Sequence, residues 1–548
     1  MQKSASSVLL VGPYDPSSGE YTFLAPPLGV WRLKGVLEAR GFAVEVFDPN
    51  CVEAGTPEQS FNSVLSSRAW DVLGFSTTGM TLRFDLALAH QARMVCPEAL
   101  LVAGGMEATF NAAAMFELGP FDLVVLGEGE KPLIAILARV TEGGEMTGIG
   151  GTAWRSEDGE VVQVPQAAMT HDELRDAIFS TPYEEMPYER YWQHLERAYR
   201  IGSLPSKAAR EARLAEIRSV RLITLNYCPM GCTFCSSTNF LNAAQGGTAR
   251  IARLDPEECM HMLERIVEAH PGVRTIIFQD DIFVFRADAR VLPLCAAIKE
   301  AKESGRLPRS LQFISTNRID AMNAERLKAM REAGFRVLGF GIESFSPGVL
   351  AEFNKSQIYD HIVPVLDNAL RLGITPFLDM ILTSPGCSIG DLGETIREGY
   401  RWIAAGCEVG MYPYVIPFSG AAMSTDPALI PQTVFATQHV HGTTIQWQQP
   451  AKILPFDAIV REAIVMIERT FEQRLATLEL DVAHLPSRVR SLLWIVSAIP
   501  ILAANGEATP ALDDAINTLV GQLPTLSLLR QSELRHDLGG SAPRRAAL

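Results

Sequence analysis

Positive charge is scarce in this chain of 548 residues. Lysine and arginine together number 48, against 63 aspartates and glutamates, which leaves a net charge of −15. A field of that sign repels polyanions, so the composition speaks against a nucleic-acid partner and against a basic membrane-binding face. Hydrophobic residues make up 47% and charged residues 20%, which is typical of a globular protein and not of a disordered chain.

Long hydrophobic runs are also missing. The most apolar stretch, residues 491–504, is shorter than the roughly 20 residues that a membrane-spanning helix needs and contains Pro500, so we expect a buried helix and no membrane span. The opening MQKSASSVLLVGPYD holds only a five-residue apolar run, so no export signal is expected. Nine cysteines, an odd number, fit a reducing compartment better than a disulfide framework, which predicts a cytoplasmic protein.

The length predicts three or four domains at about 150 residues each. In the first of them, short apolar runs alternate with amphipathic stretches, a pattern that indicates buried parallel strands joined by crossover helices. We therefore expect an α/β, Rossmann-like doubly wound domain at residues 1–145. The strand-like runs lie at 8–12, 44–48, 72–76, 100–105 and 123–130.

Periodicity weakens over residues 146–218, which we interpret as a linker region with a charged helix near its end. A second series of six strand-and-helix repeats follows and predicts a partial (β/α)6 barrel at residues 219–420, with its chemistry at the carboxyl ends of the strands. Residues 421–548 are expected to be mostly helical, to close the barrel mouth and choose the substrate, and to end in a disordered tail.

Three cysteines stand together after the first strand of the predicted barrel. Cys228, Cys232 and Cys235 form a CxxxCxxC arrangement, and neighbouring soft thiolates select zinc or an iron–sulfur cluster. A structural zinc site takes four protein ligands, and no histidine lies within 20 residues of this loop, so a zinc knuckle is the weaker alternative. A cubane held by three cysteines leaves one iron open to an outside ligand. The other six cysteines are isolated, and we assign them no role.

The motif resembles the signature of the radical S-adenosylmethionine (SAM) enzymes, CxxxCxΦC, in which Φ is an aromatic residue and here is Phe234. The resemblance implies that the three cysteines hold a [4Fe-4S] cluster, that SAM chelates the fourth iron, and that reduction cleaves SAM to a 5′-deoxyadenosyl radical. It also implies SAM contacts at the ends of later strands. Where many members have a Gly-Gly-Glu-like turn, this chain departs from the pattern; a solvated loop or a helix cap is the alternative for its carboxylates. The predicted SAM contacts are Phe234, Gln279, Asp280, Asp281, Ser315, Asn317, Arg318, Gly341 and Glu343.

The first domain, taken with the cysteines, resembles that of the cobalamin-binding radical SAM enzymes, and the resemblance covers about residues 7–418. Glycine at the open edge of the sheet permits close approach of a large planar ligand. A DxHxxG motif, which supplies histidine to cobalt in some cobalamin domains, is absent, so we expect a lower cobalt face without histidine, covered by residues 77–82. The predicted cobalamin contacts are Tyr14, Leu28, Ser76, Thr77, Thr78, Gly79, Met80, Gly104, Gly105, Glu107, Gly127, Glu128, Gly129 and Glu130. The alternative is a flavodoxin-like domain that binds nothing.

The resemblance implies a cobalamin-dependent radical SAM methyltransferase, which moves a methyl group from SAM via methylcobalamin to a carbon of a small metabolite or natural-product intermediate. A flavodoxin or ferredoxin would supply electrons. Two other functions stay open: a cyclase or ring-rearranging enzyme with the same cofactors, and a noncatalytic metal- or cobalamin-binding protein. The sequence does not identify the substrate, because one barrel fold serves many chemistries.

Overall fold

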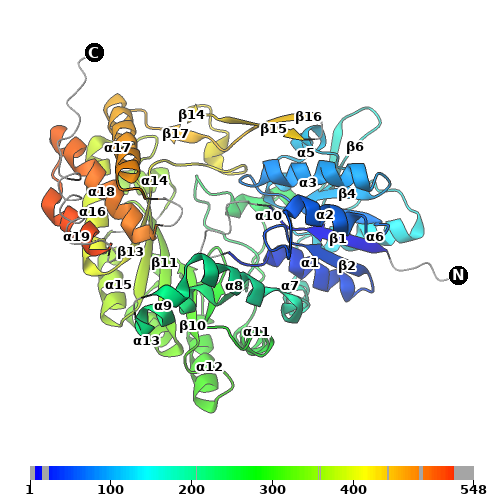
Figure 1. Ribbon diagram of the computed structural model, residues 1–548, viewed down its shortest axis with the longest axis horizontal. Coiled ribbons are helices and arrows are strands. Elements are labelled where there is room, and N and C mark those ends of the chain that lie inside the picture. Colours follow the sequence, from blue (N-terminus) through cyan, green and yellow to red (C-terminus); the bar gives the residue numbers. More distant parts are fainter. Residues whose placement is uncertain are drawn as a thin grey trace.

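Two parallel sheets with helices around them make up most of the molecule (Figure 1). The computed structural model describes residues 6–14, 24–204, 206–355, 357, 359–440, 443–480, 485–523 and 538. The N-terminal sheet lies on the right in Figure 1, the second sheet lies left of centre, and the C-terminal helices cover the far left.

The first sheet has seven strands in the order β2-β1-β3-β4-β5-β6-β7, of which the first five are parallel. The strand order 2-1-3-4-5 is the flavodoxin-like form of a doubly wound sheet, and its switch point, where ligands bind, lies between β1 and β3. β6 and β7 are antiparallel and come from the stretch expected to be a linker, so the sheet continues past residue 145. The strands are β1 (Ser7–Val11), β2 (Ala43–Phe47), β3 (Val72–Ser76), β4 (Leu100–Gly104), β5 (Leu123–Val125), β6 (Thr152–Arg155) and β7 (Val161–Val164).

Alternating side chains of these strands pack into two separate hydrophobic layers. Leu9 and Val11 of β1 belong to one cluster and Val8 and Leu10 to the other, as the period of two in a strand requires. Both faces are therefore buried, which explains why the strands are almost continuously apolar. The helices of this domain are α1 (Leu28–Glu38), α2 (Pro57–Leu65), α3 (Leu82–Val95), α4 (Met106–Phe110), α5 (Ala112–Leu118) and α6 (Glu130–Glu142).

Three helices, α7 (His171–Phe179), α8 (Tyr188–Ala198) and α9 (Lys207–Ile217), connect the two sheets. Tyr191 Oη on α8 donates to Asp48 Oδ2 beyond β2 at 2.5 Å. Trp192 Nε1, next to it, donates to the carbonyl of Ser219 at the start of the second sheet, at 3.1 Å. The expected linker is thus a structured bridge, and its expected last helix is confirmed as α9.

The second sheet has six parallel strands in chain order, which confirms the partial (β/α)6 barrel. Its strands are β8 (Ser219–Leu222), β9 (Thr275–Phe278), β10 (Gln312–Asn317), β11 (Phe335–Glu343), β12 (Thr375–Ile381) and β13 (Glu408–Tyr412). Its helices are α10 (Ser237–Gln245), α11 (Pro256–Ala269), α12 (Val291–Ser304), α13 (Ala324–Ala333), α14 (Pro347–Glu352), α15 (Tyr359–Arg371) and α16 (Ile389–Ala405).

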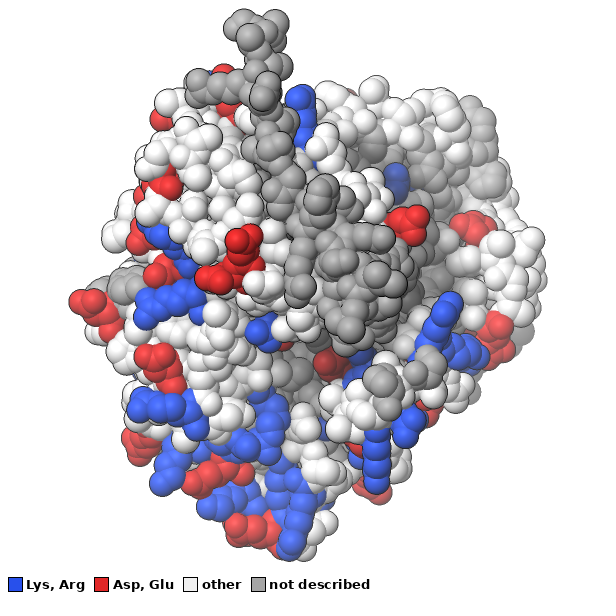
Figure 2. Space-filling model, turned by 60° about the vertical axis from the view of Figure 1, so that its left-hand side comes forward, with Lys and Arg blue, Asp and Glu red and all other residues white. Residues whose placement is uncertain are grey.

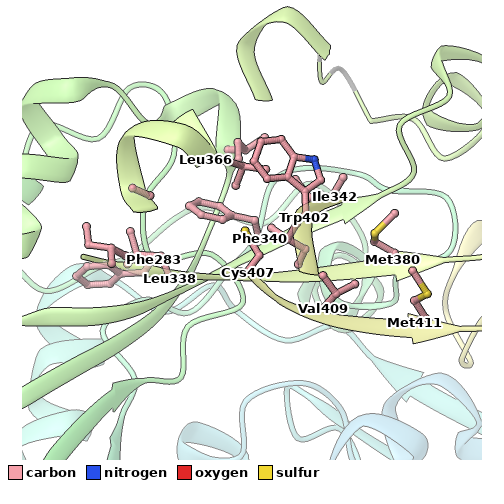
Figure 3. Close-up of a cluster of buried hydrophobic side chains, with 14 of the residues drawn as sticks. Phe283, Leu338, Phe340, Ile342, Leu366, Met380, Trp402, Cys407, Val409 and Met411 are labelled. Carbon is pink, nitrogen blue, oxygen red and sulfur yellow. The ribbon is translucent and has the colours of Figure 1, made fainter. Parts of the chain in front are cut away.

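The pleat of the last three barrel strands separates an apolar face from an inner face. Figure 3 shows Phe340 and Ile342 of β11 beside Trp402 of α16 and Leu366 of α15. Residues paired in register on neighbouring parallel strands point to the same side, so Gly341, Asp379 and Gly410, which pair with one another, lie on the opposite, inner face.

The C-terminal region is mostly helical, as expected, but it also contains two strand pairs that were not expected. β14 (Ile430–Gln432) pairs with β17 (Lys452–Leu454), and β15 (Phe435–Val440) pairs with β16 (Thr443–Gln448). The helices are α17 (Ala458–Thr477), α18 (Ser487–Ala504) and α19 (Leu512–Gly521). By length and composition α18 could cross a membrane, but 67% of its apolar window is buried within the protein, which confirms the buried helix. The tail expected to be disordered lies outside the described residues, apart from residue 538.

Basic and acidic side chains are intermixed over the face drawn in Figure 2. Many of them are paired, for example Lys299 with Glu332 at 3.0 Å, between α12 and α13. Such exposed pairs contribute little to stability.

Candidate functional site

The three cysteines lie on the loop that follows β8, and all three are half-buried free thiols. Burial raises the pKa of the Cys228 thiol to about 12, and the neighbouring Cys235 and Cys232 act in the same direction. Thiols that raise one another's pKa in this way favour a cation that accepts all three as thiolates. The donor set therefore fits a thiolate-bound cluster.

In the described part of the chain, no three histidine, cysteine, aspartate or glutamate side chains are placed to hold one metal ion. Thiolates on a single zinc ion lie about 2.3 Å from it and so crowd within about 4 Å of one another. A structural zinc site also takes four protein ligands, whereas three cysteines suffice for a cubane with one open iron. A cubane spreads its ligands over separate irons and does not require such crowding.

Asp280 and Asp281 follow β9 side by side, but their surroundings differ. Asp280 is buried, and its carboxylate accepts hydrogen bonds from the Thr224 amide at 2.6 Å, the Thr224 hydroxyl at 2.6 Å and the Leu225 amide at 2.9 Å. Burial raises its pKa to about 6, while Arg290 and these hydrogen bonds lower it. Asp280 thus fixes the backbone just ahead of the cysteine loop, whereas the Asp281 side chain is exposed.

Asp281 is exposed beside the cysteine loop. Its charge raises the pKa of the Cys228 thiol, and Ser237 at the start of α10 hydrogen-bonds its carboxylate. Gln279, two residues earlier, is also exposed. These two side chains stay the predicted SAM contacts of this turn.

The predicted SAM contacts on β10 are engaged with each other. Ser315 and Asn317 are buried, and Asn317 Nδ2 donates to Ser315 Oγ at 3.0 Å. Thr316, between them, is exposed, and its register partner is Gly339 of β11, so it lies on the inner face. Arg318 forms a bidentate ion pair with Asp320 at 2.8 and 3.0 Å. Sequence reasoning missed Thr316, since which residue faces inward depends on the strand register.

Glu343 ends β11 in a left-handed backbone conformation, with φ of 62°, where the pairing with β12 shifts register. Its carboxylate accepts from Lys355 Nζ at 2.7 Å. The same ammonium donates to the carbonyl of Gly341 at 2.7 Å. A Cβ at Gly341 would lie 2.6 Å from Glu343 Oε1 and 2.7 Å from Lys355 Nζ, so glycine makes room for this ion pair.

Asp379 and Tyr412 are a further polar pair on the inner face, and the predicted contacts did not include them. Tyr412 Oη donates to Asp379 Oδ1 at 3.5 Å. Burial and the nearby Glu343 carboxylate raise the pKa of Asp379 to about 7. A lone aspartate inside a strand carries no motif, so the signal lies only in the assembled barrel.

Asp379 should make the protein less stable as pH rises. Its folded pKa of about 7 lies above the ordinary value, so the stability tied to its proton is complete below about pH 4 and is lost as pH rises through 7. Between pH 5 and pH 8, the unfolding free energy of the wild type should fall by about 2 kcal/mol more than that of Asp379→Asn. Denaturant unfolding at both pH values measures the difference. Exposed Asp513→Asn is the control, and equal pH dependence of wild type and Asp379→Asn would contradict the expectation.

The predicted cobalamin residues gather at the carboxyl edge of the first sheet. Thr77 is buried, and its amide and hydroxyl both donate to the carbonyl of Gly104, at 2.8 and 3.0 Å. Gly105 has a φ of 96°, and a Cβ there would lie 2.6 Å from the carbonyl of Thr77. Gly105 is thus required by the packing of two neighbouring loops, and the structure gives it this role in addition to the predicted one.

The loop after β1 is tied to the loop after β3. The Tyr14 amide donates to Asp85 Oδ1 at 2.8 Å, and the Thr81 hydroxyl donates to Asp85 Oδ2 at 2.6 Å. The Thr78 and Thr81 hydroxyls lie 2.8 Å apart. Met80 between them is 71% exposed, so an apolar side chain stands at the edge where the lower cobalt face is predicted. Ser76 ends β3 and Leu28 begins α1.

The acidic residues after β5 are held by the protein itself. Glu130 is buried and pairs with Arg32 at 2.6 Å. Burial raises the pKa of Glu128 to about 7, with the Glu130 charge acting in the same direction. The Glu128 amide donates to Gln166 Oε1 at 3.2 Å. Gly129 caps α6. As cobalamin contacts, these residues stay predictions.

The edge of the first sheet meets the cysteine domain directly through α10, which begins two residues after Cys235. The rings of Phe110 on α4 and Phe240 on α10 are 6.4 Å apart. The carbonyl of Ala244 accepts from the Gln166 amide at 2.7 Å. A Cβ at Gly127 would lie 2.6 Å from Ala244 Cβ. Gly127 therefore permits this close contact.

A second connection comes from the segment after β13, residues 418–420. Asn111 Nδ2 on the cobalamin side donates to Ser419 Oγ at 2.8 Å, and Ser419 Oγ donates to Glu107 Oε1 at 3.4 Å. On the cysteine side, Asn239 Nδ2 of α10 donates to the carbonyl of Gly420 at 2.6 Å. This segment, which we call the strap, joins both predicted cofactor regions, and Gly79 lies under its Phe418 side chain.

Comparison with known proteins agrees with this arrangement. The B12 binding domain family matches residues 18–137, and the Radical SAM superfamily matches residues 222–399. An uncharacterized methyltransferase of Pyrococcus horikoshii is 22% identical over 382 residues, covering 68% of this chain and 72% of that protein. The cytidylyl-2-hydroxyethylphosphonate methyltransferase of Streptomyces wedmorensis is 24% identical over 400 residues, covering 68% of this chain and 71% of that protein.

A solved structure shares the fold over nearly the whole length. The cobalamin-dependent SAM radical enzyme OxsB, with aqua-cobalamin and SAM bound, covers 99% of this chain and 82% of its own, with a TM-score of 0.63 at 15% identity. Since both domain families match, in the order that the sequence predicts, the chain belongs to the cobalamin-binding radical SAM enzymes, whose cofactors are a [4Fe-4S] cluster, SAM and cobalamin.

Proposed function

We propose that this enzyme transfers a methyl group from SAM, by way of cobalamin, to a carbon atom of a small metabolite or natural-product intermediate. One observation carries the proposal. The helix that leaves the cysteine loop, α10, packs on α4 at the predicted cobalamin edge. A methyl group that must move between two cofactors requires such adjacency, because catalysis of this kind depends on holding the reacting groups in line.

The cofactors supply methyl and one-electron chemistry, and the chain's own task is positioning. Cys228, Cys232 and Cys235 would hold the cluster, and Asp281 would accept a hydrogen bond from the SAM amino group. The Asp379 and Tyr412 pair on the inner face would orient the substrate. The strap joins the two sides of this junction by hydrogen bonds, which favours the exclusion of water while the methyl group moves.

The relatives from Pyrococcus horikoshii and Streptomyces wedmorensis support methylation, since both are named as methyltransferases. Nine free cysteines favour a reducing compartment, and we place the enzyme in the cytoplasm. A flavodoxin or ferredoxin is the proposed electron donor.

A substrate-free experiment tests the methyl-accepting step. The protein is reconstituted anaerobically with iron, sulfide and cobalamin, reduced with dithionite, and given SAM whose methyl group carries deuterium. We expect about one equivalent of S-adenosylhomocysteine per bound cobalamin, because without substrate the cofactor accepts one methyl group and stops. Liquid chromatography with mass spectrometry measures S-adenosylhomocysteine, 5′-deoxyadenosine and labelled products.

The outcomes separate the three functions. Protein prepared without cobalamin is the control and should form no S-adenosylhomocysteine. Formation of 5′-deoxyadenosine without S-adenosylhomocysteine would favour the cyclase or rearranging enzyme. Neither product, despite a filled cluster, would favour a noncatalytic binding protein. Adding candidate metabolites should then give a product that carries the labelled methyl group.

A further inference from the structure

The turn after α14, residues 352–355, clasps the cysteine loop from the side of β11. The Thr233 amide donates to the carbonyl of Phe353 at 3.2 Å, and the Thr233 hydroxyl donates to the carbonyl of Glu352 at 3.0 Å. Asn354 Nδ2 donates to the carbonyl of Gly231 at 2.8 Å. Three hydrogen bonds thus connect this turn to the residues on either side of Cys232.

Aromatic and cationic side chains also connect the turn at 352–355 to the cysteine loop. The rings of Phe234 and Phe353 meet edge to face with centroids 5.0 Å apart. Lys355 Nζ lies 6.0 Å from the centroid of the Phe234 ring. Phe234 lies between Cys232 and Cys235 in the chain, so the Lys355 ammonium stands against the middle of the cluster-binding loop.

The Lys355 ammonium is buried and paired on one side. Its side chain and that of Glu343 are each only 10% exposed, with 2.7 Å between them. The ammonium lies beside the Phe234 ring, between two predicted cluster ligands in the chain, and the Glu343 carboxylate next to it carries the opposite charge. The Arg318 guanidinium is already neutralised by Asp320.

We propose that Lys355 is a positioning residue that raises the reduction potential of the cluster, and that Glu343 partly offsets it. The potential of an iron–sulfur cluster depends on nearby charge, hydrogen bonding and solvent exposure. Reduction adds a negative charge, so a largely buried ammonium beside the cluster-binding loop stabilises the reduced state more than the oxidised state. The proposal rests on the assignment of the cluster to the three cysteines and does not depend on methyl transfer.

Two substitutions of opposite sign test the proposal. Lys355→Met removes the ammonium and leaves the Glu343 anion, so we expect the ratio of reduced to oxidised cluster at a fixed potential to fall about tenfold, which equals about 59 mV for a one-electron couple. Glu343→Gln leaves the ammonium unopposed, and the ratio should rise. The ratio is measured without SAM, by a redox titration monitored by electron paramagnetic resonance, so that a SAM contact at Glu343 cannot contribute.

Two further variants control for the loss of a lysine side chain and for the loss of its charge. Lys452→Met is the control, because Lys452 also pairs with a glutamate, Glu468, at 3.0 Å and lies over an aromatic ring, that of Tyr414. Neither Lys452 nor these two partners belong to the cysteine loop or to the turn at 352–355, so the cluster of this variant should keep the wild-type potential. Lys355→Arg keeps the charge and should restore most of the potential.

Iron content and circular dichroism accompany each titration. Should Lys355→Met lose its cluster, Glu343→Gln and Lys355→Arg still report the sign of the charge effect. An unchanged potential in both Lys355→Met and Glu343→Gln, or a shift of both in one direction, would overturn the proposal. A cluster that persists after loss of a loop cysteine would overturn the assignment of the ligands instead, so the two failures are distinguishable.

Discussion

Replacing Cys232 with alanine should lower reductive cleavage of SAM by at least about a hundredfold and deplete the protein of cluster iron. Loss of an outer-shell partner of a metal site alone costs 10- to 100-fold, and Cys232 is a predicted direct ligand. Its neighbours Gly231 and Thr233 are held by the turn at 352–355, and neither residue offers a thiolate in its place. Iron and sulfide analysis, together with 5′-deoxyadenosine formation under dithionite, measures the effect.

Cys51→Ala is the matched control. Cys51 is half-buried in the first domain, and its carbonyl accepts a hydrogen bond from Arg190 at 3.3 Å. This variant should keep wild-type iron content and SAM cleavage. A Cys232→Ala protein that retains four irons and cleaves SAM would contradict the assignment of the cluster to this loop.

The order of strands and helices could be predicted from the sequence because it depends on local patterns. Asp255 and Pro256 begin α11 with a capping box that Glu258 completes, so the whole start signal lies within four consecutive residues. Short apolar runs such as 72–76 are typical of strands that are buried on both faces of a parallel sheet. The cysteine loop could be predicted for the same reason, because its three ligands lie within eight consecutive residues.

Side-chain roles that depend on distant contacts could not be predicted. Asp379 gains its raised pKa from Glu343 on the neighbouring strand, and the sequence does not specify that register. Ile445 and Trp447 of β16 are buried in the hydrophobic cluster of the first domain, which consists mainly of residues 9–126. A short polar hairpin gives no local sign of such a long-range partner.

The glycines at the cobalamin edge show the same limit. Gly105 and Gly127 fit the sequence-based expectation of a backbone that a large ligand approaches closely. The structure adds a reason internal to the protein, because Thr77 and Ala244 occupy the space that a side chain would need. A glycine in a sequence indicates close approach, but it does not identify which group approaches.

Asp280→Ala should destabilise the folded protein by about 3–5 kcal/mol, the cost of removing one partner from a buried charged network. Its carboxylate holds Thr224 and Leu225, and Arg290 Nη1 donates to the Thr224 hydroxyl at 3.0 Å in the same network. Asp281→Ala should change the unfolding free energy by no more than about 0.5 kcal/mol, because that side chain is exposed. Urea unfolding of both variants, compared with wild type, measures the difference.

For SAM binding, we expect Asp281→Ala to have the larger effect of the two substitutions. Losing a hydrogen bond to a charged group costs about 1.5–3 kcal/mol, so Asp281→Ala should weaken SAM binding at least about tenfold while iron content stays at the wild-type level. The change in the cluster's paramagnetic resonance spectrum on titration with SAM gives the affinity. Equal destabilisation by both substitutions would contradict the structural role that we assign to Asp280 alone. Unchanged SAM affinity in Asp281→Ala would contradict the assignment of Asp281 as the SAM contact.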